Sequence, residues 1–449
     1  MYTACKISAM PPEANWKHVP SLLALAVAAC ISIIWGFSIA RGVPGGIMGF
    51  PGLYFGTQCL THHCDPYNPQ QLENFYAAAG ALHQGESAAR TQAVTLYVNL
   101  PTTFLFVAPF TLLPLPTAQA LWSSLLISTF LIAAWLMWRE SANRAPRAAL
   151  LLLCVLLANC EIVFSGGNTA GLVVALTVIA VWCFLSSRAE LLGVLCLAVA
   201  LTLKPHDSGL VWLYFVLTGG VPRRRALQAA VVAALLTVTA VVWVSLAAPA
   251  WLPEMRANLA VINAPGGINE PGPTSIGVNS ADMIIDLQTV FSIVRNSPPF
   301  YNAATYLTCG ILFLAWARAV LRARFTPETA WLALSSAAAL SMLITYHRSY
   351  DAKLLLLAIP ACTLLRAENG ATAKIALALT AMTVFFTADI PLTIVSIATA
   401  HLPITASGIF AKFIAITLGR PAPLLLLLTA AFYLWAFTRN LHSSPESNA

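Results

Sequence analysis

Long, uninterrupted apolar runs are the feature that most constrains this chain. Two of them are "LLALAVAACISIIWGF" at 22–37 and "APLLLLLTAAFYLWAF" at 422–437. A helix needs about 20 mostly apolar residues to cross the hydrocarbon of a bilayer, whereas a membrane β-barrel alternates apolar and polar residues in short segments. The sequence therefore predicts an all-α, polytopic integral membrane protein.

The charge content of the chain supports the same class. Charged residues make up only 9% of the sequence, against about 25% in ordinary soluble proteins. The net charge of +7 comes from basic residues in short clusters between the apolar runs, which is the distribution that the positive-inside rule describes. This pattern does not indicate nucleic-acid binding. No A-x-A-like cleavage site follows the first apolar run, so we expect a retained helix rather than a signal peptide.

The basic clusters orient the chain in a membrane. We expect about 10–13 transmembrane helices between residues 20 and 438. With the clusters on the inside, residues 1–19 and 439–449 are cytoplasmic tails, and residues 42–96 and 248–302 are outer loops. We expect a multi-pass protein of a bacterial inner membrane with its site on the extracytoplasmic side.

One part of this topology has two solutions. Two apolar runs, 97–114 and 117–138, lie between the first outer loop and the basic cluster at 139–147, where an odd number of crossings is required. Either 97–114 is a re-entrant segment, or the cluster at 139–147 does not follow the rule.

The stretch "THHCDPYNP" at 61–69 is unusually polar for this chain. Asp65 is a candidate general base, and His62 or His63 is a candidate ligand for a metal or a phosphate. The alternative is a plain turn, because Asp-Pro and Asn-Pro both initiate turns. Cys59 and Cys64 flank this stretch and are able to form a disulfide if the loop is extracytoplasmic.

Three further segments place polar residues where lipid makes them costly. In "LTLKPHDSG" (201–209), Lys204 either holds a phosphate or snorkels at a helix end. In "TYHRSYDAK" (345–353), Arg348 offers the forked donor that suits phosphate oxygens, and the alternative is an interfacial anchor with an internal Arg–Asp pair. In "SGGNTAG" (165–171), Asn168 either faces the site or belongs to a tight turn.

One chemistry uses all four segments. Transfer of a sugar from a lipid-linked phosphate needs cationic donors for the charge that develops on the phosphate and one carboxylate base for the acceptor hydroxyl. A single phosphate leaving group is served by Lys, Arg and His alone, and we expect no metal and no cofactor. A sugar-lipid transporter is a second hypothesis, but transporters usually have repeated halves and midplane sites, and no repeat is evident.

The order of these motifs resembles glycosyltransferase family 87, whose members have the GT-C fold and use polyprenyl-phosphate sugars. The resemblance is carried by "PGLYFGTQCLTHHCDPYNP" (51–69), "YVNLPTTFLFVAPFTLLPLPTAQALW" (97–122), "SGGNTAGLVVAL" followed by "LAVALTLKPH", and "YHRSYDAKLLLLAIP" (346–360). It implies transfer of a hexose, mannose being the expected one, from a polyprenyl-phosphate donor to a lipid or glycan acceptor.

The resemblance also implies roles for individual residues. In the family the expected catalytic base is an aspartate at the start of the first-loop helix, and in this chain we take Asp65, in the turn downstream, as the candidate base. The expected donor-phosphate and substrate-binding residues are Lys204, His206, His347, Arg348, Tyr350, Asn168 and Tyr67. The expected partners are membrane lipid, the donor and the acceptor, with no nucleic acid.

The chain departs from the family at one position. Family members usually carry an Asp-Phe pair at the start of the first-loop helix, and here Gly49 precedes Phe50. Three interpretations remain open: Asp65 or Glu73 serves as the base, the alignment is shifted, or the protein is an inactive partner subunit.

Overall fold

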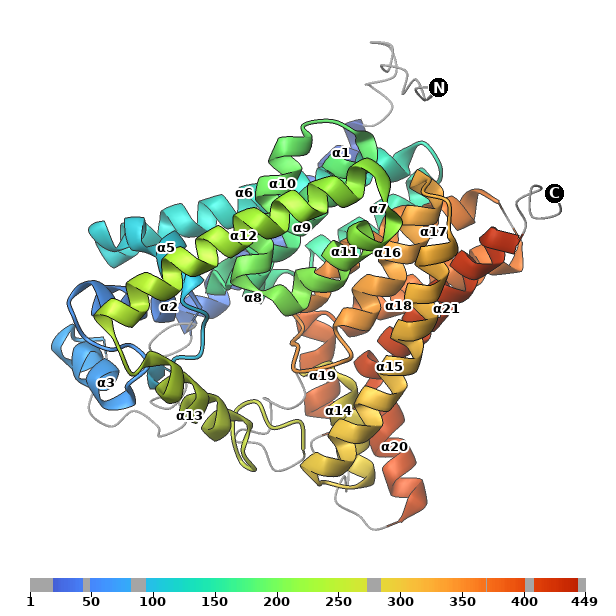
Figure 1. Cartoon of the computed structure of the whole chain (residues 1–449). Coiled ribbons are helices and arrows are strands. Elements are labelled where there is room, and N and C mark those ends of the chain that lie inside the picture. The colour runs from blue at the N-terminus through green and yellow to red at the C-terminus, as the bar shows by residue number, and fades with distance from the viewer. Residues whose placement is uncertain are drawn as a thin grey trace.

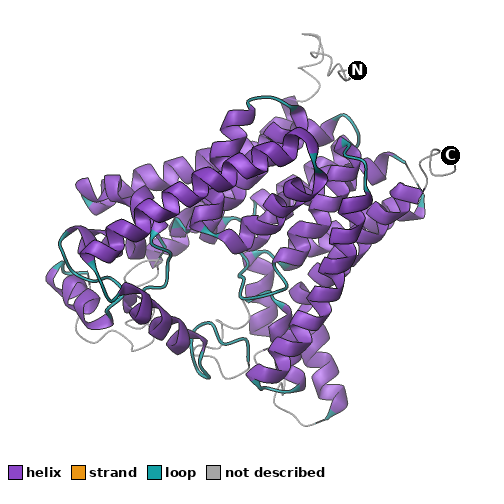
Figure 2. Ribbon diagram, viewed as in Figure 1, coloured by secondary structure: helices purple, strands orange, loops and turns teal. Residues whose placement is uncertain are grey.

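We analysed a computed structural model, which describes residues 19–42, 49–81, 94–272, 284–368, 370–399 and 408–442. This part of the chain consists of helices joined by loops and contains no strand (Figure 2). Its only extended pairing is an isolated antiparallel bridge between Ile284 and Arg348. The all-α class expected from the sequence is therefore confirmed.

Helices from the first half of the chain form one side of the molecule (Figure 1). They are α1 (Val19–Gly42), α2 (Phe50–Thr61), α3 (Pro69–Ala78), α5 (Thr102–Val107), the 3-10 helix η3 (Ala108–Leu112), α6 (Leu115–Ala142), α7 (Pro146–Leu157), α8 (Glu161–Gly166), α9 (Thr169–Ser186), α10 (Glu190–Leu203), α11 (Pro205–Thr218), α12 (Gly220–Ala247) and α13 (Trp251–Asn263).

Helices from the second half pack beside them. They are α14 (Leu287–Val294), α15 (Pro298–Arg322), α16 (Pro327–Ser341), the 3-10 helix η5 (Asp351–Leu357), α17 (Ala358–Ala367), α18 (Ala371–Phe386), α19 (Asp389–Thr399), α20 (Ile409–Gly419) and α21 (Pro421–His442). Helix α16 lies at the centre, with every residue from Ala330 to Ser341 buried.

Fewer helices than expected are long enough to cross a membrane. By length and composition, six described helices qualify: α1, α6, α9, α12, α15 and α21. A seventh is counted if α18 and α19, which are bent by 75° at their junction, make one span. Several apolar runs, including 148–165, 190–203 and 208–221, form helices of 14 residues or fewer, such as α7, α10 and α11.

Local sequence explains why these runs are short. The run 148–165 is interrupted near Asn159 and Cys160, between α7 and α8. Pro205 divides α10 from α11, because proline disfavours helical geometry in the residue before it and suits the first turn of a new helix. Such breaks bring backbone and polar side chains to positions that an unbroken span would not offer.

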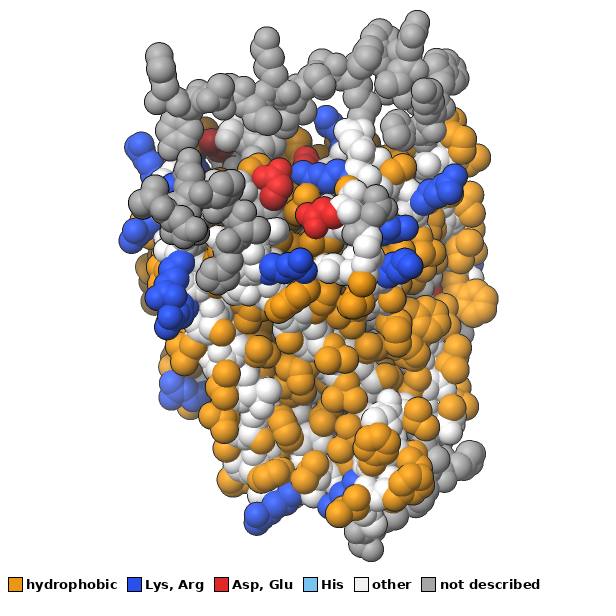
Figure 3. All heavy atoms as spheres, turned by 90° about the vertical axis from the view of Figure 1, so that its right-hand side faces the viewer, with side chains coloured by type: hydrophobic (Ala, Val, Ile, Leu, Met, Phe, Trp, Pro, Cys, Tyr) orange, Lys and Arg blue, Asp and Glu red, His pale blue; other side chains and the backbone are white. Residues whose placement is uncertain are grey.

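The lipid-facing surface is apolar. Helix α12 exposes a row of large aliphatic side chains at Val231, Leu235, Val238, Val242 and Leu246. Figure 3 shows apolar side chains covering the middle of another face, with Lys and Arg side chains along its upper and lower borders. An exposed apolar belt of this kind is what a bilayer requires of a spanning protein.

The first polar loop is packed rather than open. Cys59 and Cys64 form a disulfide across the end of α2, with Cα atoms 4.9 Å apart. At the other end of α2, Gly49 lies so close to Gly166 that a Cβ at position 49 would be 1.7 Å from the Gly166 carbonyl oxygen. The start of α2 therefore packs directly against the "SGGNTAG" segment.

Candidate functional site

The break between α10 and α11 places Lys204 in an unusual position. Lys204 ends α10 and precedes α11, with φ −145° and ψ 83°, the extended geometry that a following proline favours. Its carbonyl accepts hydrogen bonds from the Asp207 and Ser208 amides of the next turn. The Lys204 side chain therefore projects from the junction between the two helices.

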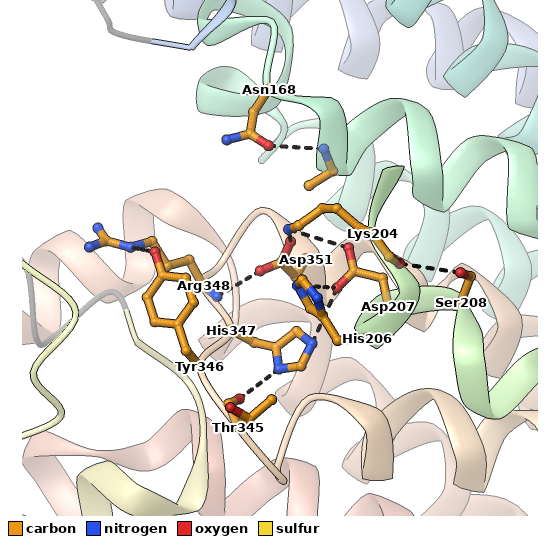
Figure 4. Close-up of polar contacts among 11 residues, drawn as sticks. Asn168, Lys204, His206, Asp207, Ser208, Thr345, Tyr346, His347, Arg348 and Asp351 are labelled. Atoms are coloured by element: carbon orange, nitrogen blue, oxygen red, sulfur yellow. Dashed lines mark hydrogen bonds and ion pairs between the residues drawn. The ribbon is translucent and has the colours of Figure 1, made fainter. Parts of the chain in front are cut away.

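Lys204 lies between two buried aspartates from distant parts of the sequence (Figure 4). Its Nζ atom is 2.5 Å from Asp351 Oδ1 and 3.4 Å from Asp207 Oδ2. Both carboxylate side chains are 1% exposed, while the lysine side chain is 16% exposed. The lysine is therefore the most exposed side chain of this triad.

Two histidines complete the group around Asp207. His347 Nε2 is 3.2 Å and His206 Nε2 is 3.5 Å from Asp207 Oδ1. The two rings meet edge to face with centroids 5.0 Å apart. His347 is fully buried, and its Nδ1 lies 2.7 Å from the Thr345 carbonyl oxygen, whereas the His206 side chain is 39% exposed. We call Lys204, His206, Asp207, His347 and Asp351 the central cluster.

The segment that carries His347 is fixed from both sides. The Arg348 amide donates to Asp351 Oδ2 at 2.8 Å, and the Asp351 amide donates back to the Arg348 carbonyl at 2.9 Å. The Ile285 amide donates to the His347 carbonyl at 2.9 Å, next to the isolated bridge. A turn and a second segment of chain together hold the histidine against Asp207.

Arg348 adds a cation at the edge of the central cluster. Its Nε donates to the Tyr346 hydroxyl at 2.5 Å and its terminal nitrogen to the Ile268 carbonyl at 2.8 Å. The Tyr350 ring lies 5.3 Å from Lys204 Nζ, a cation–π distance. Arg348 and Tyr350 are both half-buried.

The charges within the central cluster compensate each other. Burial opposes ionisation of Asp207, but Lys204 and the histidines outweigh it and hold its pKa below the usual range. The pKa of Asp351 is raised, because burial and the neighbouring Asp207 outweigh Lys204. Burial also opposes protonation of His347, yet Asp207 raises the pKa of that imidazole above 6.5.

His206 behaves in the opposite way. Burial and the adjacent Lys204 lower its pKa to about 3, so it is a neutral ring at physiological pH. The two histidines therefore differ in role: His347 is the candidate cation, and His206 is a neutral donor or acceptor at the exposed edge.

The same residues contain a possible metal-ligand set. His206, Asp207 and His347 offer ligand atoms that all lie within 4.8 Å of one another. Two histidines and one carboxylate occur together in catalytic zinc sites. Lys204 would oppose a cation here, because its ammonium group already lies 3.4 Å from Asp207. The expectation of metal-independent chemistry remains a prediction.

Asp65 and Tyr67 belong to a second polar group. Asp65 Oδ1 accepts a hydrogen bond from the Tyr67 amide at 2.9 Å, and the Tyr67 hydroxyl donates to the Asn99 carbonyl at 2.7 Å. Burial raises the pKa of Asp65, and the nearby Glu254 raises it further. Glu254, from the first turn of α13, accepts a hydrogen bond from Asn68 and has one buried oxygen without a hydrogen-bond partner.

The two groups are connected through the segment 97–102. Tyr67 bonds to Asn99, and the Thr102 hydroxyl donates at 2.5 Å to the carbonyl of Thr202, two residues before Lys204. Figure 1 nevertheless places α2 and α3 toward one side of the molecule and α14 toward the other. The structure therefore joins the expected base to the central cluster through intervening backbone, not by direct contact.

Asn168 has a structural role. Its Oδ1 accepts a hydrogen bond from the Ala170 amide at 2.9 Å and caps α9, while Gly167 beside it has φ +61°. In Figure 4 its side-chain amide nitrogen points away from that capping bond. The tight turn that the sequence suggested as an alternative is thus present.

Four of the site residues predicted from the sequence lie together in the structure, and three acidic residues near them or near Asp65 were not predicted. Lys204, His206, His347 and Arg348 lie together, with Tyr350 beside them. Asp207 and Asp351 were inside the quoted motifs next to the cations, and that adjacency is the signal that identifies them. Glu254 lies in the expected outer loop 248–302, where no motif singled it out. Its proximity to Asp65 is evident only in the folded structure.

The model of glycosyltransferase family 87 matches residues 97–346. The matched segment contains Lys204, His206 and Asp207 but ends just before His347, and the Asp65 loop lies outside it. No curated protein and no solved structure was found to match the chain.

Proposed function

Because the chain belongs to glycosyltransferase family 87 and is a membrane glycosyltransferase, we propose that it transfers a hexose, mannose being expected, from a polyprenyl-phosphate donor to a lipid or glycan acceptor. The observation that supports this proposal most directly is the central cluster. It gathers a lysine, a histidine whose pKa Asp207 raises, and an adjacent arginine at a helix break between apolar helices.

The donor phosphate is assigned to the accessible side of this cluster. Lys204 and Arg348 contribute fixed positive charge, and His206 contributes a neutral ring nitrogen at the exposed edge. Asp207 and Asp351 hold the cations in place from the buried side. Preorganised donors stabilise charge that develops in the transition state, and loss of one typically costs about 10²–10³ in rate.

We assign deprotonation of the acceptor hydroxyl to Asp65. In the reaction the bond between the sugar anomeric carbon and the phosphate oxygen breaks, and its electron pair stays on the phosphate. A bond forms from the acceptor oxygen to the same carbon, and the hydroxyl proton passes to Asp65. Burial and Glu254 raise the pKa of Asp65, which makes this carboxylate a better proton acceptor than an ordinary exposed aspartate.

We place the site on the extracytoplasmic face of a bacterial inner membrane. Support comes from the Cys59–Cys64 disulfide, which lies in the loop that carries Asp65. Disulfides persist in oxidising compartments and are rare in the cytosol. The substrates are then membrane lipid carriers and acceptors, without nucleic acid and without a cofactor.

The test is sugar transfer by purified protein in lipid vesicles, supplied with radiolabelled polyprenyl-phosphate-mannose and a membrane-lipid extract. Wild type is compared with Asp65→Asn and Glu254→Gln. We expect Asp65→Asn to abolish transfer, and Glu254→Gln to leave transfer measurable but to shift its pH profile to lower pH, because removal of a neighbouring carboxylate lowers the pKa of Asp65.

The remaining outcomes separate the alternatives. Transfer that survives Asp65→Asn would contradict the assignment of the base and direct attention to Glu73, which is half-buried on α3. Movement of the intact donor across the vesicle without transfer would indicate a transporter. Absence of transfer with every donor sugar tested would support an inactive partner subunit. Inhibition by a chelator that added metal reverses would contradict metal-independent transfer.

A further inference from the structure

A second site lies away from the central cluster, in a groove between α10 and α12. The groove has a volume of about 760 Å³, within the range of small-ligand sites. Its walls are formed by Leu191 and Leu195 from α10 and by Leu227 and Val231 from α12. These four side chains are all strongly exposed, between 46% and 67%. The groove is therefore open toward the lipid-facing surface.

One end of the groove carries positive charge that the protein does not neutralise. Arg223 and Arg224 line it, and both are exposed. Neither guanidinium group makes a hydrogen bond or ion pair with another residue in the described part of the chain. The next residue, Arg225, is different, because its Nη2 lies 2.6 Å from Glu190 and its Nη1 donates to Gln228.

The position of these arginines is unfavourable for the helix itself. Arg223 stands in the first turn of α12 and Arg224 directly follows it, at the end where the helix dipole already presents positive charge. Cationic side chains at a helix N-terminus are destabilising, whereas a bound anion there is stabilising. The positive-inside rule explains basic residues on this side of the membrane, but it does not explain why two of them border an apolar groove.

We propose that this groove binds an anionic phospholipid. Arg223 and Arg224 hold the headgroup phosphate at the α12 N-terminus, and an acyl chain lies between α10 and α12 against the four aliphatic side chains. The occupant is a phospholipid rather than a partner helix, because the groove continues from an apolar trough directly into two free cations. A phospholipid matches this arrangement, because it has a charged headgroup at one end and an apolar acyl chain at the other.

The test is native mass spectrometry of the full-length protein in detergent, titrated with phosphatidylglycerol or with phosphatidylcholine. Variants are Arg223→Gln with Arg224→Gln, and separately Leu195→Trp, which fills the groove and keeps every charge. The matched control is Arg147→Gln with Arg322→Gln, which removes two exposed arginines outside the groove. Circular dichroism checks that each variant is folded.

We expect the wild type to bind phosphatidylglycerol in preference to phosphatidylcholine. Loss of both groove arginines should weaken phosphatidylglycerol binding about 30-fold, at roughly fivefold for each cation near a membrane surface. Leu195→Trp should weaken it as well, and the control pair should leave it unchanged. Equal binding of both lipids, equal loss in the control pair, or unaltered binding in either groove variant would each overturn the proposal.

Discussion

Lys204 Nζ lies 2.5 Å from Asp351 Oδ1 and so joins two motifs that are 147 residues apart in sequence. The contact fixes the α10–α11 break against the start of η5. Asp207 and His347 meet beside it, one from each motif. This single ion pair therefore positions most of the proposed phosphate site.

Replacement of Lys204 by Met should destabilise the protein and abolish transfer. The substitution leaves Asp207 and Asp351 buried without their main cation, and a buried charge deprived of its partner typically costs about 3–5 kcal/mol. The thermal unfolding midpoint of the detergent-solubilised protein measures the loss. Adding Asp351→Asn to Lys204→Met should recover part of the stability but none of the activity. If Lys204→Met alone is as stable as the wild type, the two aspartates are not held by this lysine.

Stability should fall as pH rises through the pKa of His347. The pKa of this group is raised in the folded protein, so its stabilising contribution is complete below the unfolded value of 6.5 and is lost as pH rises past the folded value. Unfolding midpoints measured between about pH 6 and pH 9 should show this decline in the wild type. In His347→Gln the decline should be smaller.

Two neighbours of His347 provide the controls for this experiment. Asp286 is buried with its pKa raised to about 7, so it contributes a decline in the same direction, and Asp286→Asn removes that part. The pKa of His206 is lowered from 6.5 to about 3 in the folded protein, so this residue contributes a rise in stability as pH increases toward 7, and His206→Gln should make the net decline steeper at the low end of the range. A wild-type slope that His347→Gln does not alter would show that His347 is not the titrating group.

Gly49→Ala should destabilise the protein by about 1–3 kcal/mol, the usual cost of overpacking. A Cβ at this position would meet the Gly166 carbonyl oxygen, which belongs to the backbone and cannot rotate away. Gly52→Ala, in the next turn of α2, is the matched control, because the nearest atom to its Cβ is the Tyr76 hydroxyl at 3.9 Å. Equal stability of the two variants would contradict the close contact. Gly49→Asp, which introduces the residue that the family resemblance led us to expect at this position, should be at least as destabilising as Gly49→Ala.

The Cys59–Cys64 disulfide should be detectable chemically. Thiol titration of the unfolded protein should find two more thiols after reduction than before it, since the seven other cysteines in the described residues are unpaired. Cys59→Ser combined with Cys64→Ser should remove this difference. Protein made without access to an oxidising compartment should also lack it, and a disulfide that forms in the cytosol would remove the support for an extracytoplasmic loop.

Much of the fold class and part of the site were predictable from local sequence. Apolar runs of the right length predicted the helical membrane class because burying a backbone in lipid requires it to satisfy its own hydrogen bonds. Lys204, His206, His347 and Arg348 were identifiable because ionisable side chains among apolar runs are costly and therefore uncommon without a role. Pro205 marked the break that exposes Lys204.

Other features depended on contacts between distant segments. Whether a given apolar run becomes a full span or a short helix was decided by packing, as α10 and α11 show. The pairing of Asp65 with Glu254, and the contact of Gly49 with Gly166, follow from no local pattern, because each joins residues far apart in the chain. The sequence alone determined which residues are able to carry charge in this membrane protein. Only the tertiary structure decided which of those charges meet, because Coulomb interactions and burial depend on distance in space rather than along the chain.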